Sequence, residues 1–518
     1  MSHLSLYFLL KTGLYYTHSL GFHWVWNLLL AVAAFWPLPP GRWQRVRTWL
    51  VWPLAIALLY HDSFLPTPQR VWSQLGTVGG FSASYLLELV QRVVSPQALV
   101  AFGLALLAYA VLARWLRFAT LAVLAILSVP LLAALGPATP AAEAALAQAA
   151  DPEGATKAAP YDTQLQAFYA AEHLRKLVFP AQVAAPAFDV IVLHVCSLSW
   201  DDLDLANARN APLLQRFDVL FSHFNSAASY SGPATFRIFR GNCGQSAHAR
   251  LYQGTDASCY TFPSLEKAGL RTSGLLNHNG IFDGFAKIVE HEAGLGGRME
   301  SNRNGTVQMQ SFDGTPVYDD YGLLSQWWTQ RLQKGSAPVA LYYNTISLHD
   351  GNRLPGSTAR SSLDTYKPRL LKLLADFDRF VTQLEASGRP VVLLLVPEHG
   401  ASLRGDAVQI PGMREIPDPK ITLVPAAIKL IGMQAPASRV GPVLVQQDIS
   451  YFGLNALLAD LMRDNPFVPG GIPLAQRLDT LETTPFVAEN DDVVMLRNPA
   501  GGYVLKSNDG TWVPFSKP

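Results

Sequence analysis

The first quarter of the chain is dominated by apolar runs separated by short polar stretches. Five of these runs predict membrane-spanning helices, and they cover residues 4–20, 24–38, 48–60, 98–113 and 118–135. A spanning helix needs about 20 mostly apolar residues, and the last two runs come nearest to that length. Lys11 interrupts the first run, for which an interfacial helix is the alternative interpretation. The pattern therefore predicts an α-helical transmembrane anchor of about five helices over residues 1–137.

Arginines in two of the polar stretches predict how this anchor is oriented. They lie between the second and third runs and between the fourth and fifth runs, at Arg42, Arg45, Arg47, Arg114 and Arg117. Loops rich in Lys and Arg stay on the cytoplasmic side of a membrane. The chain is therefore expected to begin inside and to lie outside after residue 137. Residues 81–94 then fall on the outer face, where their helical apolar spacing predicts an interfacial helix.

Beyond the anchor the pattern changes twice. Residues 138–160 are rich in Ala and Pro and lack a core-building pattern, which predicts a linker. From residue 161 onward, helical stretches alternate with short apolar runs at 188–196, 272–277, 338–346, 390–396 and 421–428. The runs VIVLHV and VVLLLV are apolar throughout, which is typical of strands buried on both faces of a parallel sheet. Residues 161–518 are therefore predicted to form a doubly wound, mostly parallel α/β domain, with a small β appendage after residue 490.

Composition and charge agree with this division. The 518 residues are 49% hydrophobic and carry a net charge of only +1. Residues 1–137 hold eight Lys or Arg and two Asp or Glu, a balance of +6, whereas the remainder has a balance of −5. Eight of the 12 tryptophans also lie in residues 1–137. A basic, Trp-rich, apolar segment fits a membrane anchor, and a nearly neutral chain argues against nucleic-acid binding.

Groups able to bind a metal or attack phosphorus stand where buried strands are predicted to end. Cys196 ends one run, and Glu398 with His399 follows another. Parallel α/β sheets bind ligands at these strand ends, and Cys, Glu and His are zinc ligands. Ser231 opens a predicted helix, whose amides favour an anionic phosphate. The residues predict a phosphoryl-transfer site; a buried filler role for Cys196 and a helix cap role for Ser231 are the alternatives.

The cysteine count leaves one thiol unpaired. The chain has three cysteines, and the compartment predicted above is oxidising. Cys243 and Cys259 stand in one polar stretch and are expected to form a disulfide, which the chain-entropy model values at about 3 kcal/mol. Zinc coordination would then explain an unpaired Cys196 in that compartment. Pairing of Cys196 with Cys243 is the alternative that the sequence leaves open.

Four segments occur in order: LHVCSLSWDDL, SYSGPATFR, SLHDGN and PEHGASLRG. They resemble the motifs of the alkaline phosphatase superfamily, in particular its membrane-anchored phosphoethanolamine transferases of the bacterial cellulose-modifying type. The resemblance covers nearly the whole chain and implies a sheet of the alkaline phosphatase or sulfatase type. It also implies one zinc ion, with Ser231 as both ligand and nucleophile and with Cys196, Glu398 and His399 as the other ligands.

The resemblance also implies substrates and a location. Matching motifs assign substrate binding to Tyr230, His349 and Arg414, although the residues alone leave a structural loop role for His349 and a surface role for Arg414 open. The implied reaction transfers phosphoethanolamine from phosphatidylethanolamine to hydroxyls of extracytoplasmic cellulose through a covalent phosphoethanolamine-serine intermediate. The expected location is the bacterial inner membrane, multi-pass, with the catalytic domain in the periplasm. The cellulose synthase complex is a candidate partner, and the sequence leaves open whether the chain contacts it.

The same residues are compatible with two other functions. One is a phosphoethanolamine or phosphoglycerol transferase that acts on lipid A or another glycan, and Cys196 counts against it because most such relatives have a carboxylate there. The other is a non-catalytic membrane scaffold of a cellulose synthase complex. The intact set of Cys196, Ser231, Glu398 and His399 counts against a scaffold, which does not need all four.

Overall fold

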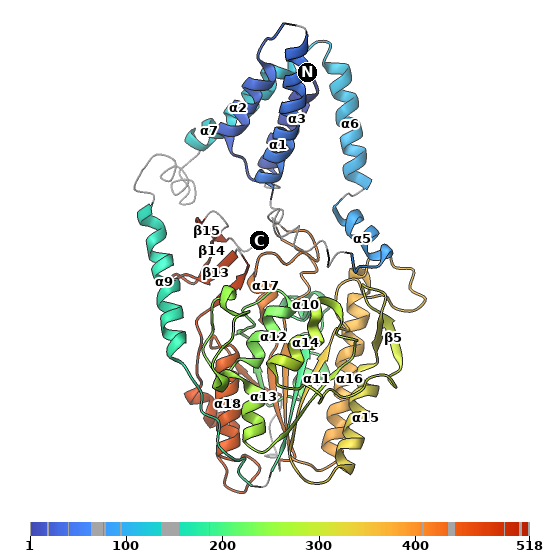
Figure 1. Cartoon of the computed structure of the whole chain (residues 1–518), viewed down its shortest axis with the longest axis vertical. Helices are drawn as coiled ribbons and strands as arrows, with labels where there is room; N and C mark the ends of the chain where they lie inside the picture. Colours follow the sequence, from blue (N-terminus) through green and yellow to red (C-terminus); the bar gives the residue numbers. More distant parts are fainter. Residues whose placement is uncertain are drawn as a thin grey trace.

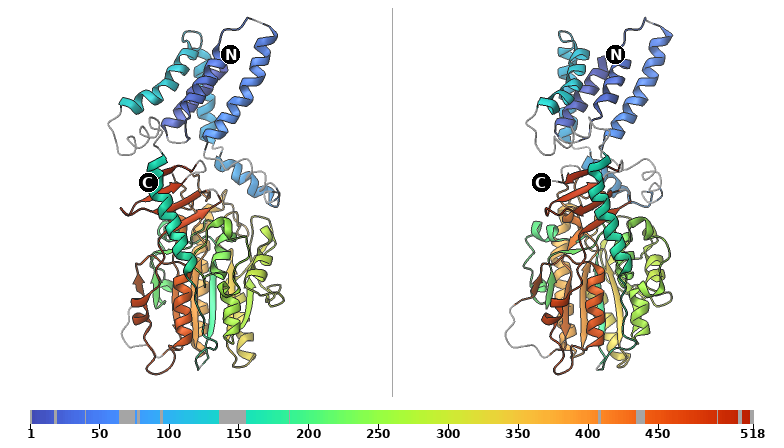
Figure 2. Two further views of the ribbon diagram at one scale, coloured as in Figure 1. Left: turned by 60° about the vertical axis from the view of Figure 1, so that its left-hand side comes forward. Right: turned by 90° about the vertical axis from the view of Figure 1, so that its left-hand side faces the viewer.

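In the computed structural model, a group of N-terminal helices adjoins a larger α/β domain (Figure 1). Two further views show the same two parts at opposite ends of the molecule (Figure 2). The structure describes residues 2–17, 20–39, 41–63, 76, 79–93, 96–135, 155–185, 187–406, 409–433, 441–491, 493–506 and 510–515.

Helices occupy the apolar segments of the N-terminal part. They are α1 (Ser2–Tyr16), α2 (Trp24–Phe35), α3 (Arg42–Asp62), α5 (Ala83–Val93), α6 (Pro96–Leu112) and α7 (Phe118–Leu135). Four of them pack into one apolar cluster that includes Phe8 of α1, Ala31 of α2, Ala55 of α3 and Ile126 of α7. Over their described residues, none of these helices combines the length and the apolar content of a candidate membrane span. The helices are thus present as predicted, and their insertion into a membrane stays a prediction.

A long helix, α9 (Ala155–Leu174), leads into the α/β domain. Most of the predicted linker, residues 138–154, lies outside the described residues. Its last part, 155–160, is helical and belongs to α9. Alanine has the highest helix propensity, and the Ala-rich sequence therefore extends the helix backwards. The following turns of α9 are held by tertiary packing, since Phe168 contacts the C-terminal sheet.

A seven-stranded sheet in the order β11-β2-β10-β8-β1-β7-β4 forms the centre of the α/β domain. Its strands are β1 (Asp189–Val195), β2 (Val219–Phe221), β4 (Arg271–Leu276), β7 (Val339–Thr345), β8 (Val391–Pro397), β10 (Ala427–Ile431) and β11 (Val443–Val445). Strand β10 runs antiparallel to its neighbours β8 and β2, and the other described pairs are parallel. The prediction of a mostly parallel sheet is confirmed.

The predicted strand at 421–428 is wrong at residues 421–422 and is interrupted after residue 424. Pro419 begins the short helix α17 (Pro419–Thr422), whose N-terminus is capped where the Asp418 carboxylate accepts from the Lys420 N–H. Proline suits the first turn of a helix because its fixed φ is already helical and it lacks an N–H that would go unused. The chain then forms β9 (Leu423–Val424), which pairs with β3 (Phe224–Asn225), and enters the main sheet as β10.

Both faces of the sheet are buried, because successive side chains of a strand point to opposite sides. In β1, Val190 and Val192 belong to one apolar cluster, whereas Ile191 and Leu193 belong to another. The first face is covered by α12 (Ser231–Phe239), α13 (Thr261–Lys267), α14 (Phe285–Glu292) and α18 (Tyr451–Arg463). The second is covered by α10 (Trp200–Leu205), α11 (Pro212–Gln215), α15 (Asp320–Gln333) and α16 (Tyr366–Ala386). The domain is doubly wound, as predicted.

Smaller elements complete the domain. The predicted β appendage is an antiparallel sheet of β12 (Val487–Asn490), β13 (Val493–Arg497), β14 (Tyr503–Lys506) and β15 (Trp512–Phe515). A hairpin is formed by β5 (Val307–Gln310) and β6 (Pro316–Tyr318), and α19 (Leu474–Arg477) follows α18.

Candidate active site and metal centre

The candidate site is built where the parallel neighbours β1 and β8 end. Val195 of β1 is in register with Pro397 of β8. The residues that follow, Cys196 and Glu398, therefore emerge side by side at the same edge of the sheet. The Glu398 backbone N–H donates to the Val195 carbonyl at 2.8 Å and fixes this junction. Strand register thus brings a thiol and a carboxylate together although 202 residues separate them in sequence.

A third segment brings the serine to the same place. Ser231 is the first residue of α12, and its Oγ lies 3.4 Å from Cys196 Sγ and 3.3 Å from His399 Nε2. His399 Nε2 in turn lies 3.9 Å from Cys196 Sγ and 3.8 Å from Glu398 Oε2. Ligand atoms bonded to zinc at about 2.0–2.3 Å in a tetrahedron stand about 3.3–3.6 Å apart. The four predicted ligands therefore lie at nearly the separations that a zinc site requires.

The imidazole of His399 is held in the form that binds a metal. Its Nδ1–H donates to the Gly400 carbonyl at 2.9 Å. Nε2 therefore carries the lone pair, and this atom is the one that faces Cys196 and Ser231. A carbonyl partner on the remote nitrogen is the usual way in which a protein orients a metal-binding histidine.

Burial disfavours the charged forms of these side chains unless a cation binds beside them. Burial, together with the charge of Glu398, raises the pKa of the Cys196 thiol to about 12. Burial also raises the pKa of Glu398 and, with the Arg414 charge, lowers the pKa of His399 well below its usual value. Among the described residues, Glu398 Oε2 has no hydrogen-bond partner. A buried oxygen without a partner is costly, so a cation fits here, and the sulfur, oxygen and nitrogen donors suit zinc.

Asn344 and His278 orient Glu398, and neither was predicted from the sequence as a site residue. Asn344, in β7, donates from Nδ2 to Glu398 Oε1 at 2.6 Å. His278 Nε2–H donates to Asn344 Oδ1 at 3.0 Å, and its Nδ1 accepts from the Gly280 N–H at 3.1 Å. Burial lowers the pKa of His278 to about 4, so the ring is neutral at pH 7. A sequence signal for Asn344 did exist, because it is a polar residue within the mostly apolar run ALYYNT.

Two of the predicted substrate-binding residues, Tyr230 and Arg414, lie together beside the candidate metal ligands. The Arg414 guanidinium lies 5.4 Å from the centre of the Tyr230 ring and donates to Ser197 Oγ at 3.2 Å. Tyr230 OH donates to Glu415 at 2.5 Å. Arg414 is 8% exposed, which excludes a surface role. Within the described part of the chain its Nε has no hydrogen-bond partner, and a buried guanidinium with an unused donor suits an anion.

His349, the third predicted substrate-binding residue, lies in the loop after β7. Its Nδ1–H donates to the Asp350 carbonyl at 2.6 Å, and its ring packs on Phe312 with 4.5 Å between centroids. Burial and the charge of Arg414 lower the pKa of His349 to about 4. The imidazole is therefore neutral at pH 7 and able to accept a proton at Nε2. Its contact with substrate stays a prediction.

The predicted disulfide between Cys243 and Cys259 is present, and Cys196 is a buried free thiol. The alternative pairing of Cys196 with Cys243 is thereby excluded. The disulfide lies in the segment that follows α12, so it constrains the chain beyond the helix that carries Ser231. The Cys196 sulfur is therefore available to a metal ion.

A second group of potential metal ligands lies among the N-terminal helices. Ligand atoms of His23, His61 and Asp62 lie within 4.8 Å of one another. The Asp62 carboxylate, however, is already paired with Lys11 at 2.8 Å and accepts from Asn27 at 2.9 Å. A divalent cation at this place would be repelled by the lysine ammonium group. The group around Cys196 is therefore the better candidate for a metal centre.

The doubly wound sheet, the serine at a helix N-terminus and the three buried donors define an α/β protein with a candidate site for metal-assisted group transfer. Family models of the cellulose biosynthesis protein BcsG match residues 4–131 (N-terminal domain) and 144–512 (C-terminal domain). The chain is 37% identical over 536 residues to the cellulose biosynthesis protein BcsG of Salmonella typhimurium and to that of Escherichia coli, covering 98% of this chain and 95% of each relative. The chain therefore belongs to the BcsG family of cellulose biosynthesis proteins.

Several solved structures share a distant likeness of shape. A protein in the alkaline phosphatase superfamily from Vibrio parahaemolyticus has a TM-score of 0.48 at 14% identity and covers 69% of this chain and 91% of its own. The integral membrane protein lipooligosaccharide phosphoethanolamine transferase A from Neisseria meningitidis has a TM-score of 0.42 at 14% identity, covering 85% and 96%. The periplasmic domain of EptC from Escherichia coli, in complex with Zn, has a TM-score of 0.40 at 12% identity, covering 55% and 86%. Scores this low decide nothing about the metal or the substrates of this chain.

Proposed function

We propose that this chain transfers phosphoethanolamine from phosphatidylethanolamine to hydroxyl groups of cellulose, with Ser231 as nucleophile and one zinc ion as cofactor. The proposal rests on Ser231 Oγ, which stands at the N-terminus of α12 within 3.4 Å of Cys196 Sγ and 3.3 Å of His399 Nε2. Membership of the BcsG family supports cellulose as the acceptor, and the motif resemblance supports the phospholipid donor. The proposed location is the bacterial inner membrane, with the α/β domain in the periplasm.

In the first step, Ser231 Oγ attacks the phosphorus atom of the phospholipid. A bond forms between Oγ and phosphorus while the bond from phosphorus to the diacylglycerol oxygen breaks. The serine proton passes to that oxygen, diacylglycerol leaves, and phosphoethanolamine stays esterified to Ser231. The Arg414 guanidinium and the first N–H groups of α12 bind the phosphate oxygens as their charge changes. A neutral His349 is suited to carry the proton at its Nε2.

In the second step, a cellulose hydroxyl attacks the same phosphorus atom. Its bond to phosphorus forms as the bond to Ser231 Oγ breaks, and its proton returns to the serine. The same groups serve both steps because the two displacements are chemically alike. Zinc, when held by Cys196, Glu398 and His399, supplies positive charge that favours the ionised form of a neighbouring hydroxyl. Asn344 keeps Glu398 turned toward the other ligands.

The test is intact-protein mass spectrometry of the purified full chain after incubation with vesicles that contain phosphatidylethanolamine. The expected result is an adduct of the mass of phosphoethanolamine that maps to Ser231 and is missing from the Ser231→Ala variant. Zinc content is measured on the same samples. A zinc-loaded wild-type protein that forms no adduct would overturn the two-step reaction and favour the scaffold alternative.

The acceptor is tested by analysis of polymers from cells that carry either protein. Cellulose that bears phosphoethanolamine only in cells with wild-type protein supports the proposal. Modified lipid A in place of modified cellulose would instead point to the alternative transferase. Modified cellulose from cells that carry only Ser231→Ala would show that the chain is not the catalyst.

A further inference from the structure

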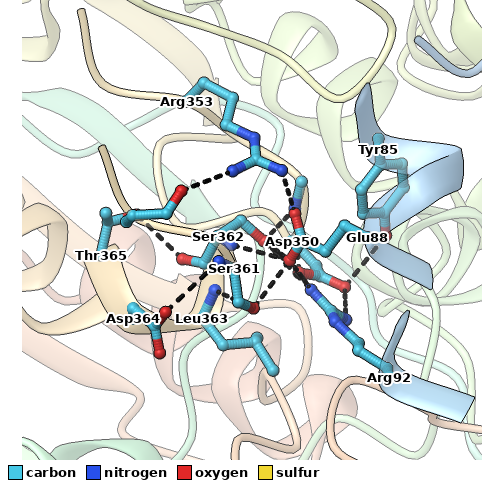
Figure 3. Close-up of polar contacts among 12 residues, drawn as sticks. Tyr85, Glu88, Arg92, Asp350, Arg353, Ser361, Ser362, Leu363, Asp364 and Thr365 are labelled. Carbon is cyan, nitrogen blue, oxygen red and sulfur yellow. Dashed lines mark hydrogen bonds and ion pairs between the residues drawn. The ribbon is translucent and has the colours of Figure 1, made fainter. Parts of the chain in front are cut away.

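Helix α5, which belongs to the N-terminal part of the chain, packs its charged side on the α/β domain (Figure 3). Tyr85 and Glu88 are 6% and 3% exposed, and the Arg92 side chain is 10% exposed. Leu87 and Val90, on the other side of the helix, are each 58% exposed. A surface helix normally buries its apolar side and exposes its charges. The reversed arrangement of α5 indicates that its charged residues have specific partners in the domain.

The first partner is Asp350, the residue after His349. Arg92 binds this carboxylate with both ends of its guanidinium, Nη1 to Oδ2 at 2.6 Å and Nη2 to Oδ1 at 2.7 Å. Tyr85 OH donates to Oδ2 at 2.9 Å. Burial acts to raise the pKa of Asp350, but the hydrogen bonds and charge of Arg92 outweigh it and hold that pKa below its usual range. Asp350 is therefore an ionised carboxylate in a two-pronged pair, the strongest form of such a contact.

The second partner is the segment that carries Ser361 and Ser362. Glu88 accepts from Ser361 Oγ and from the Ser362 N–H, each at 2.7 Å, and it also pairs with Arg92 and Arg353. Ser362 Oγ donates to Asp350 Oδ1 at 2.6 Å, which closes the network. Two turns of α5 thus tie the loop after β7 to the segment that leads into α16, as the close-up shows (Figure 3).

Helix α5 also contacts the loop that carries Arg414. A Cβ atom added to Gly412, two residues before Arg414, would lie 2.5 Å from Arg92 Nη1. A Cβ atom on Gly351 would lie 2.8 Å from the Tyr85 ring, and Gly351 has a φ of +83°, which only glycine adopts readily. Side chains of α5 therefore lie against the backbone of both loops. These are the loops that carry His349 and Arg414, the residues proposed to bind phosphate.

The aromatic side chains around α5 make the same connection. The Phe312 ring lies 4.5 Å from the His349 ring and 6.2 Å from the Tyr85 ring, between centroids. Phe81, just before the helix, packs on Phe312 at 5.7 Å, and the Ser82 N–H donates to the Phe312 carbonyl at 2.9 Å. His349 is therefore enclosed by contacts that depend on the position of α5.

We propose that α5 is a structural part of the active site, in which Arg92 and Glu88 are positioning residues that hold the loops of His349 and Arg414 in their phosphate-binding arrangement. The inference deepens the proposed function and rests on it. Its consequence is that the α/β domain alone has an incomplete site, which the N-terminal part of the chain completes. A misplacement of about 1 Å in such loops costs about 10²-fold in rate.

The experiment compares three variants of the full chain: Arg92→Ala, Arg92→Lys and the control Gln91→Ala, which alters an exposed neighbour on the same helix. Two quantities are measured: the maximal rate of the phosphoethanolamine adduct on Ser231 with phosphatidylethanolamine vesicles, and amide hydrogen exchange of residues 347–365. Arg92→Ala is expected to lower the maximal rate about 10²-fold and to speed exchange at Gly351 and Ser362, with zinc content unchanged. Arg92→Lys is expected to lie between Arg92→Ala and wild type in both quantities, because lysine keeps the positive charge but cannot make the two-pronged contact of a guanidinium group. Gln91→Ala behaves as wild type.

Two results would overturn the inference. One is a wild-type rate of adduct formation in Arg92→Ala, and the other is unchanged exchange at Gly351 and Ser362. If even the wild-type protein forms no adduct, the proposed function fails, and the exchange data alone then decide whether α5 orders the two loops. If Arg92→Ala does not fold, Glu88→Gln provides the same comparison, because it weakens the contacts to Ser361 and Ser362 and retains a polar side chain of the same shape.

Discussion

Replacing Asn344 with leucine is expected to weaken zinc binding while the domain stays folded. Asn344 donates to Glu398 Oε1 at 2.6 Å and accepts from His278 at 3.0 Å. Leucine has nearly the same shape but makes neither hydrogen bond. Glu398 then loses the neutral donor that turns it toward the other ligands. The metal site is disturbed although all of its proposed ligands remain.

The size of the effect can be worked out in two ways. A hydrogen bond to a charged group contributes about 1.5–3 kcal/mol. Loss of an outer partner of a metal ligand lowers affinity by about 10- to 100-fold, which corresponds to about 1.4–2.8 kcal/mol. The two values agree, so we expect the Kd for zinc to rise by about 10- to 100-fold.

The assay is a competition between the purified full chain and a zinc chelator of known affinity. Asn242→Leu is the matched control, because Asn242 is equally buried and donates to the Ser258 and Tyr260 carbonyls, away from the metal ligands. Both variants are expected to lose some thermal stability, but only Asn344→Leu should lose zinc affinity. An unchanged Kd in folded Asn344→Leu would refute the reasoning, as would an equal loss in both variants.

Three further predictions concern stability. Replacing Cys243 and Cys259 by alanine is expected to lower the free energy of unfolding by about 3 kcal/mol, measured by denaturant titration against the oxidised wild type. For His278 the folded pKa is about 4, whereas the unfolded chain takes up the proton near pH 6.5. The folded state therefore loses about 3 kcal/mol as the pH falls through this window, and His278→Gln should flatten the profile of unfolding free energy against pH. Asp189 is fully buried and bonded to two arginines at the amino end of β1; Asp189→Asn should cost about 3–5 kcal/mol, and an unchanged unfolding midpoint would contradict it.

The site couples two parts of the chain that differ in character. The strand ends supply the candidate metal ligands and Ser231 comes from α12, while the surrounding loops contact α5. The proposed reaction takes its donor from a lipid surface and its acceptor from a polymer, and such a reaction needs its site close to the proposed anchor. The contact between α5 and the loops of His349 and Arg414 offers a physical link between them.

The sequence by itself determined the elements whose pattern is local. The apolar runs of β1 and β8 predicted buried strands, and the polar residues directly after them, Cys196, Glu398 and His399, predicted the metal site. The Gly-Pro after Ser231 predicted the start of a helix. The strands and the helix are present, and the three polar side chains lie close together, because a parallel sheet places the ends of its strands at one edge. The metal itself stays a prediction. The strand at 421–428 failed in part because a single capping residue, Asp418, turned its beginning into a helix.

Tertiary structure alone decided which distant groups meet. In the sequence, Asn344 is an ordinary polar residue in a predicted strand. Only the strand register places its amide beside Glu398. The pattern around Glu88 and Arg92 is that of the solvent-exposed side of an amphipathic helix. In the structure, however, Arg92 pairs with Asp350, which lies 258 residues further along the chain. The reason is physical: hydrophobic periodicity records which side of an element is apolar, whereas a buried ion pair depends on the position and geometry of a partner that the periodicity does not record.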